Sequence, residues 1–303
     1  MLHAETSGSG PRLVLAHGFT QTARSWGRFG ELIGAGRELV RVDLPGHGGS
    51  AEVRADLAES AALLVEVASA DGAPFDLLGY SLGGRVALHA ALAAPSGLRR
   101  VVLIGATGGI EDPAAREERR RRDEALAAQA EADLEEFLVR WVASPMFAGL
   151  ADPGLGERRR NSPAGLASSL RLAGTGTQEP LWDRLGEVRV PLLALAGAGD
   201  VRFALAAARL AHGVPAGVFS LVPGAGHAAH LAQPACCAAI VRRFLDAGDL
   251  AGARDATGAG TAAGVLDAAG TRDATGARDA ADARDAAVAR DAAGARDAAG
   301  AAP

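Results

Sequence analysis

Residues 75–84 read FDLLGYSLGG, and they hold the pattern Gly-x-Ser-x-Gly between Gly79 and Gly83. The mostly apolar run before the pattern predicts a buried strand, and residues 82–94 predict a helix. A serine between two glycines on such a tight strand-to-helix turn is the arrangement of a nucleophile elbow. Ser81 is therefore the first candidate catalytic residue, and the alternative is an ordinary glycine-rich turn with an exposed serine.

Short apolar runs alternate with helix-like stretches on both sides of this turn. Runs that predict further strands lie at 12–16, 39–44, 100–106, 190–197 and 218–224. Further helices are predicted near 52–70, 202–212 and 229–246. Continuous apolar runs of this length are typical of strands buried on both faces. The alternation therefore predicts an α/β fold with a mostly parallel, doubly wound sheet.

The alternation stops after Ala106 and resumes near residue 190. Asp112 followed by Pro113 is typical of a helix start. Apolar side chains then recur at helical spacing on one face, at Leu134, Phe137, Leu138, Trp141 and Val142. We therefore expect a helical cap inserted into the α/β core. The expected division is core at 1–110 and 185–247, cap at 111–184, and tail at 248–303.

The expected tail differs in composition from the rest of the 303-residue chain. The last aromatic residue is Phe244, and beyond it the sequence is mostly Ala, Gly, Asp, Arg and Thr, with an Arg-Asp pair every six residues from 272 to 296. Such a sequence buries too little apolar surface to offset the entropy of ordering. We predict a low-complexity tail that is disordered or a transient Ala-rich helix, and whose removal near Gly248 leaves activity and melting temperature nearly unchanged.

Charge and cysteine content limit the partners and the location. The net charge is −5, all 31 basic residues are arginines, and the chain has no basic arm, which argues against nucleic acid. No segment approaches 18 apolar residues, so no membrane insertion is expected. The adjacent Cys236 and Cys237 make a poor disulfide, and the first ten residues do not resemble a signal peptide, which favours the cytoplasm. The seven histidines lack metal-ligand spacing, so we expect no metal and no cofactor; the oligomeric state stays open.

Two further side chains follow predicted strands and complete a candidate triad. Asp200 comes just after the strand at 190–197, and His227 just after the strand at 218–224. Because parallel strands end at one edge of the sheet, Ser81, Asp200 and His227 can converge there. His227 would take the proton of Ser81, and Asp200 would fix the tautomer of His227. The alternatives are a helix N-cap for Asp200 and an ordinary loop histidine for His227.

Other polar residues compete for these roles. Asp43 also ends a strand, but with His47 it is expected to hold the turn in which both lie. His230 is expected to begin the last helix. The isolated histidines, which we expect to be structural or exposed, are His3, His89 and His212.

Two backbone N–H groups are candidates for an oxyanion hole. One belongs to Leu82, directly after the serine, and the other to Phe19, in the loop after the strand at 12–16. The alternative for the Phe19 loop is a simple turn at a strand end.

Together these motifs resemble the α/β-hydrolase superfamily. Over residues 1–247 they resemble, more narrowly, the 2-succinyl-6-hydroxy-2,4-cyclohexadiene-1-carboxylate synthases of menaquinone biosynthesis. The narrower resemblance rests on GYSLGGR at 79–85, the run from Arg116 to Asp123, Trp141 with PMF at 145–147, the run from Asn161 to Leu166, and GTGTQEPLW at 174–182.

The resemblance implies a carbon–oxygen lyase that eliminates pyruvate from a small polycarboxylate, 2-succinyl-5-enolpyruvyl-6-hydroxy-3-cyclohexene-1-carboxylate. Ser81, activated by His227 and Asp200, would remove a ring proton, and the N–H groups of Phe19 and Leu82 would stabilise the oxyanion. The implied substrate-binding residues are Tyr80, Arg85, Arg119, Trp141 and Arg158. Arginine pairs well with carboxylates.

Several of these residues could instead have a purely structural role. Arg119 lies in a run of four arginines that favours a solvated helix face, Trp141 has the spacing of a core residue, and Tyr80 can simply pack under the cap.

Two other functions also stay open: a serine hydrolase, either an esterase or a C–C bond hydrolase, that uses the same triad, and a non-catalytic ligand receptor on the same fold. A pyruvate-release assay and a covalent serine probe separate them.

Overall fold

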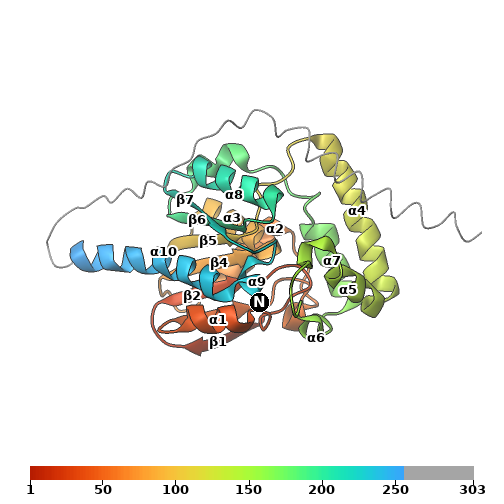
Figure 1. Ribbon diagram of the computed structural model, residues 1–303, viewed down its shortest axis with the longest axis horizontal. Helices are drawn as coiled ribbons and strands as arrows, with labels where there is room; N and C mark the ends of the chain where they lie inside the picture. Colours follow the sequence, from red (N-terminus) through yellow and green to blue (C-terminus); the bar gives the residue numbers. More distant parts are fainter. Residues whose placement is uncertain (256–303) are drawn as a thin grey trace, which may run out of the picture. The chain divides into compact units, whose positions relative to one another are not determined.

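A seven-stranded sheet forms the centre of the protein, in the order β1-β3-β2-β4-β5-β6-β7 (Figure 1). The computed structural model describes residues 1–255, with side chains up to 247. The strands are β1 (Ala4–Gly8), β2 (Arg12–Ala16), β3 (Glu38–Val42), β4 (Phe75–Tyr80), β5 (Leu98–Ile104), β6 (Leu192–Gly197) and β7 (Gly217–Val222). Every neighbouring pair is parallel except β1 with β3. The predicted α/β fold with a mostly parallel sheet is therefore confirmed.

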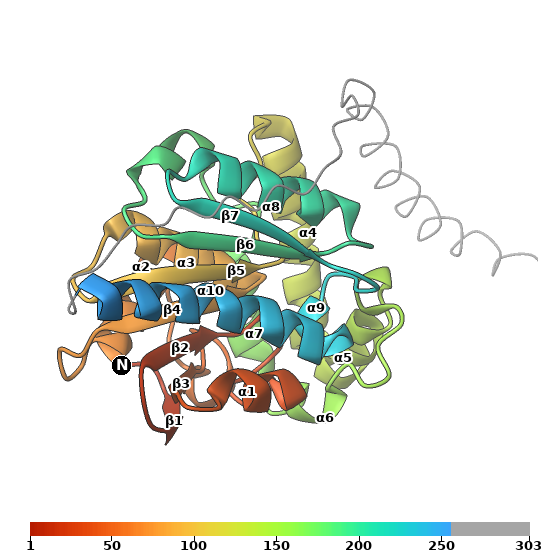
Figure 2. The same ribbon diagram turned by 60° about the vertical axis from the view of Figure 1, so that its left-hand side comes forward.

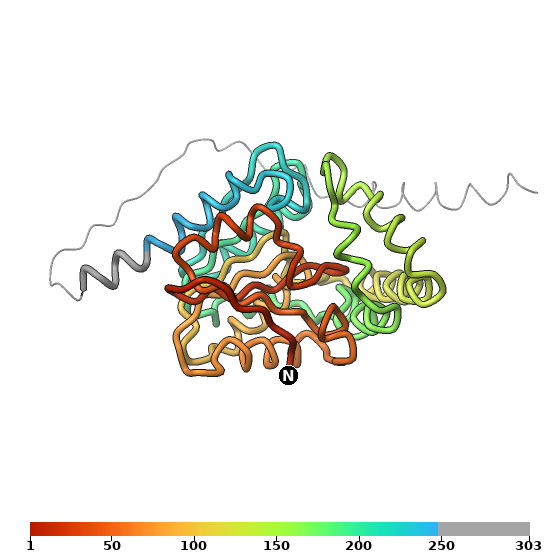
Figure 3. Tube along the Cα trace, turned by 90° about the horizontal axis from the view of Figure 1, so that it is seen from below, coloured from red at the N-terminus to blue at the C-terminus, as the bar shows by residue number. Residues whose placement is uncertain are grey.

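Helices cover both faces of the sheet. On one face lie α2 (Leu57–Ala68), α3 (Leu82–Ala93) and α8 (Val201–Gly213), and on the other lie α1 (Gly27–Gly34) and α10 (Pro234–Asp255). Figure 2 shows α1 and α10 in front of the strands, and Figure 3 shows α2 on the opposite side of the sheet. Alternate side chains of each inner strand enter the two apolar layers; in β4, Leu77 joins the first and Leu78 the second. This is the doubly wound arrangement that the sequence predicts.

A group of helices occupies the chain between β5 and β6. These are α4 (Pro113–Ala132), α5 (Leu134–Val142), α6 (Leu155–Arg158) and α7 (Pro163–Ala173), with the 3-10 turns η2 (Pro145–Phe147) and η3 (Trp182–Glu187). The side chain of Asp112 accepts a hydrogen bond from the Ala115 N–H, which caps α4 as its sequence predicts. Phe137 and Leu138 of α5 are buried against Leu166 of α7. Figure 1 shows these helices side by side at one end of the sheet.

The edge strand β1 and the helix α1 were not predicted from the sequence. β1 reads AETSG and lies at the edge of the sheet with half-buried or exposed side chains, so it lacks the apolar run of an inner strand. α1 reads GRFGELIG; it has only eight residues, and three of them are glycines, which disfavour a helix, although Phe29, Leu32 and Ile33 share one helix face. The six predicted strands are confirmed, with ends displaced by at most two residues.

The last helix continues past the expected end of the core. Its backbone runs through Asp255, and the rest of the tail predicted at 248–303 lies outside the described residues. Among the described helices, none combines the length and the apolar composition needed to cross a membrane.

Candidate active site

Ser81 lies on a strained turn between β4 and α3. Its backbone has φ 51° and ψ −107°, an angle pair that few residues other than glycine adopt. A Cβ on Gly83 would lie 2.0 Å from the Ala16 carbonyl oxygen, and one on Gly79 would lie 2.2 Å from the Gly83 carbonyl oxygen. Because those atoms belong to the backbone and cannot swing aside, the two glycines are required for the serine to hold this position.

The three side chains expected to form a triad are in contact. The Ser81 hydroxyl lies 3.1 Å from Nε2 of His227, and Nδ1 of His227 lies 2.9 Å from Oδ2 of Asp200. The other carboxylate oxygen of Asp200 accepts a hydrogen bond from the Phe203 N–H at the start of α8, so Asp200 is also the helix N-cap that was its alternative. With Nδ1–H donated to Asp200, Nε2 of His227 is free to accept the serine proton.

The two residues that carry the candidate oxyanion donors lie at the same cavity as Ser81. Phe19 and Leu82 both line it, and within the described residues neither backbone N–H has a hydrogen-bond acceptor. Leu82 is the first residue of α3, where the helix dipole adds positive potential. N–H groups that have no acceptor and lie beside a nucleophile or base can stabilise a negatively charged oxygen that forms there.

The cavity lies between the sheet and the inserted helices. Of the five predicted substrate-binding residues, it is lined by Arg85, Arg119 and Trp141. Further lining side chains, to which no role was assigned from the sequence, include Met146, Ser169, Arg202 and Phe203. The Phe203 ring packs 4.3 Å from the His227 ring, centroid to centroid, and no sequence motif pointed to it.

Arg85 is a buried cation held by neutral groups. Its Nη1 donates to the Gly174 carbonyl oxygen at 3.2 Å and to Gln178 Oε1 at 3.5 Å, and no described carboxylate bonds to it. Desolvation, together with the positive charge of Arg119, lowers the pKa of Arg85 to about 9. A cation in this position favours an anionic ligand in the cavity.

Arg119 differs from the arginines beside it. Its Nε donates to Oδ1 of the buried Asp123 at 2.8 Å, and its side chain is only 31% exposed. Arg120, Arg121 and Arg122 are about half exposed or more and pair with glutamates on the outer face of α4. The solvated-face alternative therefore describes those three arginines, whereas Arg119 faces the cavity.

The structure does not bring Arg158 and Tyr80 into the lining of this cavity. Arg158 is buried; its Nη1 donates to Thr20 Oγ1 and to the Phe19 carbonyl oxygen, and its guanidinium stacks on the Phe147 ring at 4.9 Å. Burial lowers the pKa of Arg158 to about 10. Its Nη2 is buried without a partner among the described residues.

Tyr80 and His230 pack against each other behind Ser81. Their ring centroids lie 4.3 Å apart, and His230 also contacts Trp26. The prediction that His230 begins the last helix is wrong, because it lies in the separate short helix α9 (Ala229–Ala232) and Pro234 starts α10. Burial lowers the pKa of His230 to about 3.

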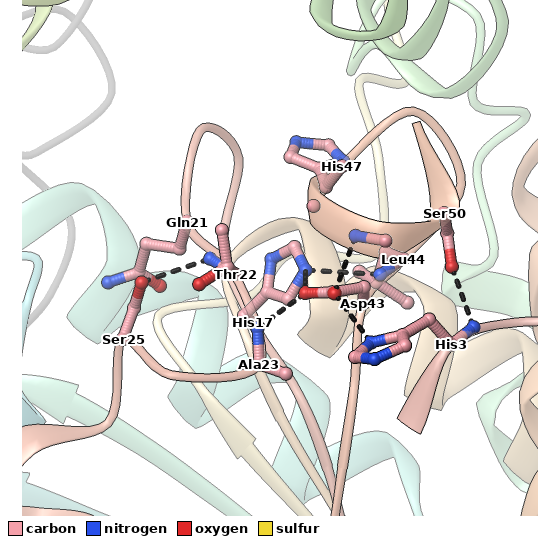
Figure 4. Close-up of polar contacts among 12 residues, drawn as sticks. His3, His17, Gln21, Thr22, Ala23, Ser25, Asp43, Leu44, His47 and Ser50 are labelled. Carbon is pink, nitrogen blue, oxygen red and sulfur yellow. Dashed lines mark hydrogen bonds and ion pairs between the residues drawn. The ribbon is translucent and has the colours of Figure 1, made fainter. Parts of the chain in front are cut away.

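Asp43 stays out of the triad and holds the backbone near the Phe19 loop (Figure 4). Its Oδ1 accepts from the Ala23 N–H at 2.6 Å, and its Oδ2 accepts from the Gly49 N–H at 2.8 Å and contacts His3 Nδ1 at 2.9 Å. Nε2 of His47 accepts from the Thr20 N–H at 3.2 Å. The loop-holding role expected for Asp43 and His47 agrees with these contacts.

Comparisons with known proteins show which sequences this chain is similar to. The family model described as "Alpha/beta hydrolase family" matches residues 13–240. A 2-succinyl-6-hydroxy-2,4-cyclohexadiene-1-carboxylate synthase of Escherichia coli O1:K1 / APEC is 35% identical over 245 residues, covering 78% of this chain and 95% of the relative. A protein of Bacillus subtilis (strain 168) described as a "Putative" synthase of the same name is 34% identical over 251 residues, 77% of this chain and 89% of its own.

Two solved structures are also similar to this chain. The "Structure of MenH from S. aureus" is 30% identical, with a TM-score of 0.76, and covers 82% of this chain and 100% of that chain. A thermophilic esterase from Thermogutta terrifontis, at 23% identity and a TM-score of 0.69, covers 81% of this chain and 93% of its own; it shares the fold.

Proposed function

This chain belongs to the 2-succinyl-6-hydroxy-2,4-cyclohexadiene-1-carboxylate synthases of the alpha/beta hydrolase family, and from that premise we propose that it eliminates pyruvate from 2-succinyl-5-enolpyruvyl-6-hydroxy-3-cyclohexene-1-carboxylate. The observation that carries the proposal is a buried arginine without a carboxylate partner, Arg85, in the same cavity as the Ser81–His227 contact. The carboxylates of the substrate suit the buried arginine, and the proton that it loses next to a carbonyl suits the Ser81–His227 contact.

In the proposed reaction, Nε2 of His227 takes the hydroxyl proton of Ser81, and the Ser81 oxygen removes a proton from the substrate ring. Negative charge builds on the conjugated carbonyl oxygen, where the N–H groups of Phe19 and Leu82 receive it. The carbon–oxygen bond to the enolpyruvyl group then breaks, and the departing oxygen takes a proton from His227. Enolpyruvate becomes pyruvate by tautomerisation, and Ser81 remains unmodified. One oxyanion donor lowers such a barrier by about 2.7–4 kcal/mol.

Substrate carboxylates supply the counter-charge for the arginines in this proposal. Arg85 and Arg119 line the cavity and are the first candidates, with Trp141 as an apolar wall. Tyr80 and Arg158 are included through the family resemblance. The buried Nη2 of Arg158, which lacks a partner among the described residues, supports a further anion contact.

A serine hydrolase is the second candidate, because the same contacts among Ser81, His227 and Asp200 also suit attack on an ester. The two differ in product. We expect release of pyruvate from the cyclohexene substrate, measured in an assay coupled to lactate dehydrogenase. Turnover of p-nitrophenyl acetate should be slow. Brisk ester turnover without pyruvate would contradict the elimination. A Ser81→Ala variant with every tested turnover unchanged would favour the non-catalytic receptor.

The same proposal places the enzyme in the cytoplasm. Both cysteines, Cys236 and Cys237, are free thiols, which suits a reducing compartment. The proposed elimination involves no net redox change, so the chemistry requires only the proton transfers assigned to Ser81 and His227.

A further inference from the structure

Thr20 adopts a backbone conformation that threonine rarely tolerates. Its φ is 66°, in the left-handed region, and its side chain is fully buried. A β-branched residue in this region costs on the order of 1–3 kcal/mol, so the surrounding contacts must hold it there. Thr20 directly follows Phe19, whose N–H is one of the two candidate oxyanion donors. The conformation of Thr20 therefore bears on where that donor points.

Contacts reach Thr20 from both sides of the cavity. On the core side, the Thr20 N–H donates to Nε2 of His47 at 3.2 Å. On the side of the inserted helices, Nδ2 of Asn161 donates to the Thr20 carbonyl oxygen at 2.7 Å. The same Asn161 side chain accepts a hydrogen bond at Oδ1 from the Gly48 N–H, at 3.0 Å. Asn161 thus connects the Phe19–Thr20 loop to the turn that follows β3.

The backbone that carries Asn161 is firmly seated. A Cβ on Gly46 would lie 2.4 Å from the Gly165 carbonyl oxygen, and a Cβ on Gly165 would lie 2.4 Å from the Gly46 carbonyl oxygen. The first turn of α7 therefore packs backbone to backbone against the turn that follows β3. Asn161 is itself buried, at 5% exposure, so its amide cannot exchange these partners for water.

We propose that Asn161 is a positioning residue of the oxyanion hole: its amide holds Thr20 in the left-handed conformation and thereby aims the Phe19 N–H at the reacting oxygen. The inference rests on the proposed function for the oxyanion that forms, but the backbone geometry it describes can be measured without any substrate. Asn161 is not among the residues that line the cavity. Its Nδ2 also donates to the Arg158 carbonyl oxygen at 2.9 Å, so it acts on the loop through Thr20 and through Arg158, whose Nη1 donates to Thr20 Oγ1 and to the Phe19 carbonyl oxygen. A residue of the inserted helical region, Asn161, then positions the Phe19 N–H, which belongs to the core.

Asn161→Asp is the most direct test, because it keeps the shape of the side chain and the acceptor for Gly48. It replaces the nitrogen that donates to the Thr20 and Arg158 carbonyl oxygens with a second oxygen, which repels both of them. Loss of a complete oxyanion donor lowers kcat by about 100- to 1,000-fold, and we expect a fall in kcat of about 30-fold or more with KM changed less than about threefold. A KM effect without a kcat effect would overturn the proposal.

Ser162→Ala is the matched control on the adjacent residue. Ser162 caps α7 by accepting from the Gly165 N–H at 3.1 Å and does not touch Thr20. Loss of a cap costs about 1 kcal/mol, so this variant should lower Tm while kcat stays within about twofold. If Ser162→Ala lowered kcat as much as Asn161→Asp, the effect would be one of helix stability and the proposal would fail.

Thr20→Gly provides a rescue, because glycine adopts a positive φ without strain. In that background, adding Asn161→Asp should cost less than about threefold in kcat, since the loop no longer needs to be held. An equal cost in both backgrounds would overturn the role of Asn161 in holding the φ angle of Thr20.

A crystal structure of Asn161→Asp tests the inference even if the protein releases no pyruvate: we expect Thr20 to leave positive φ, and an unchanged loop would refute the inference.

Discussion

Replacing Arg85 with methionine should separate ligand binding from folding stability. Methionine is close in size to arginine, is unbranched like it, and removes the buried charge. Burial lowers the pKa of Arg85 from 12.5 to about 9, and each unit corresponds to about 1.4 kcal/mol, so the charge is held at a cost of several kcal/mol. The Gly174 carbonyl oxygen keeps a hydrogen bond from Thr177 Oγ1 at 2.9 Å, whereas Gln178 Oε1 loses only the long contact of 3.5 Å.

Two opposite changes follow for Arg85→Met. The free energy of unfolding of the ligand-free protein should rise by about 1–4 kcal/mol, as it does when buried charged groups are replaced by packed apolar ones. Binding of the substrate should weaken, because a hydrogen bond to a charged group contributes about 1.5–3 kcal/mol. That range corresponds to a rise in KM for pyruvate release of about 10- to 150-fold.

Urea unfolding and steady-state pyruvate release measure the two changes on one preparation. Arg121→Met is the control, because Arg121 is 68% exposed and pairs with Glu117 at the surface of α4, where such pairs contribute little. Both quantities should stay near wild type in that variant. A destabilised Arg85→Met protein with unchanged KM would refute the reasoning, since Arg85 would then be a structural cation and not a ligand contact.

Two further predictions concern the fold. Gly83→Ala would place a Cβ 2.0 Å from the Ala16 carbonyl oxygen, so we expect a loss of about 3 kcal/mol or more in urea unfolding, and wild-type stability would contradict the assigned geometry. Three buried histidines have pKa values lowered by burial to between about 3 and about 4, namely His17, His47 and His230. Because the unfolded chain binds their protons below about pH 6.5, each should reduce the free energy of unfolding by up to about 1.4 kcal/mol per pH unit from there toward pH 4. Equal stability at pH 7 and pH 5, measured by urea unfolding, would show that these rings are not held neutral.

The apolar runs of the sequence predicted the five inner strands and also the edge strand β7, although Val218, Phe219 and Leu221 of β7 are exposed. A strand buried on both faces needs a continuous apolar run, and its carboxyl end is where polar side chains such as Ser81, Asp200 and His227 can gather. β1 escaped prediction because its sequence, AETSG, has no apolar run; an edge strand does not need one, although β7 at the other edge has one. His230 was misplaced because nothing local marks the short helix α9 except the proline that ends it.

Long-range contacts decided the remaining positions. Arg158 was chosen as a cavity residue, yet its guanidinium binds Thr20, 138 residues away in sequence. Asn161 belonged to a motif that the family resemblance supplied, but its bond to Thr20 depends on how α7 sits against the turn after β3. No periodicity or spacing in the sequence carries that information, because it arises only when the two segments pack.

The central claim is that Ser81 acts as a base and is never acylated. Intact-protein mass spectrometry during turnover, with pyruvate release followed in the same sample, tests it most directly. We expect sustained pyruvate release with no added mass on the wild-type protein, and a loss of at least about a thousandfold in kcat for Ser81→Ala. A substrate-derived adduct on Ser81 that forms and decays at the turnover rate would contradict the claim.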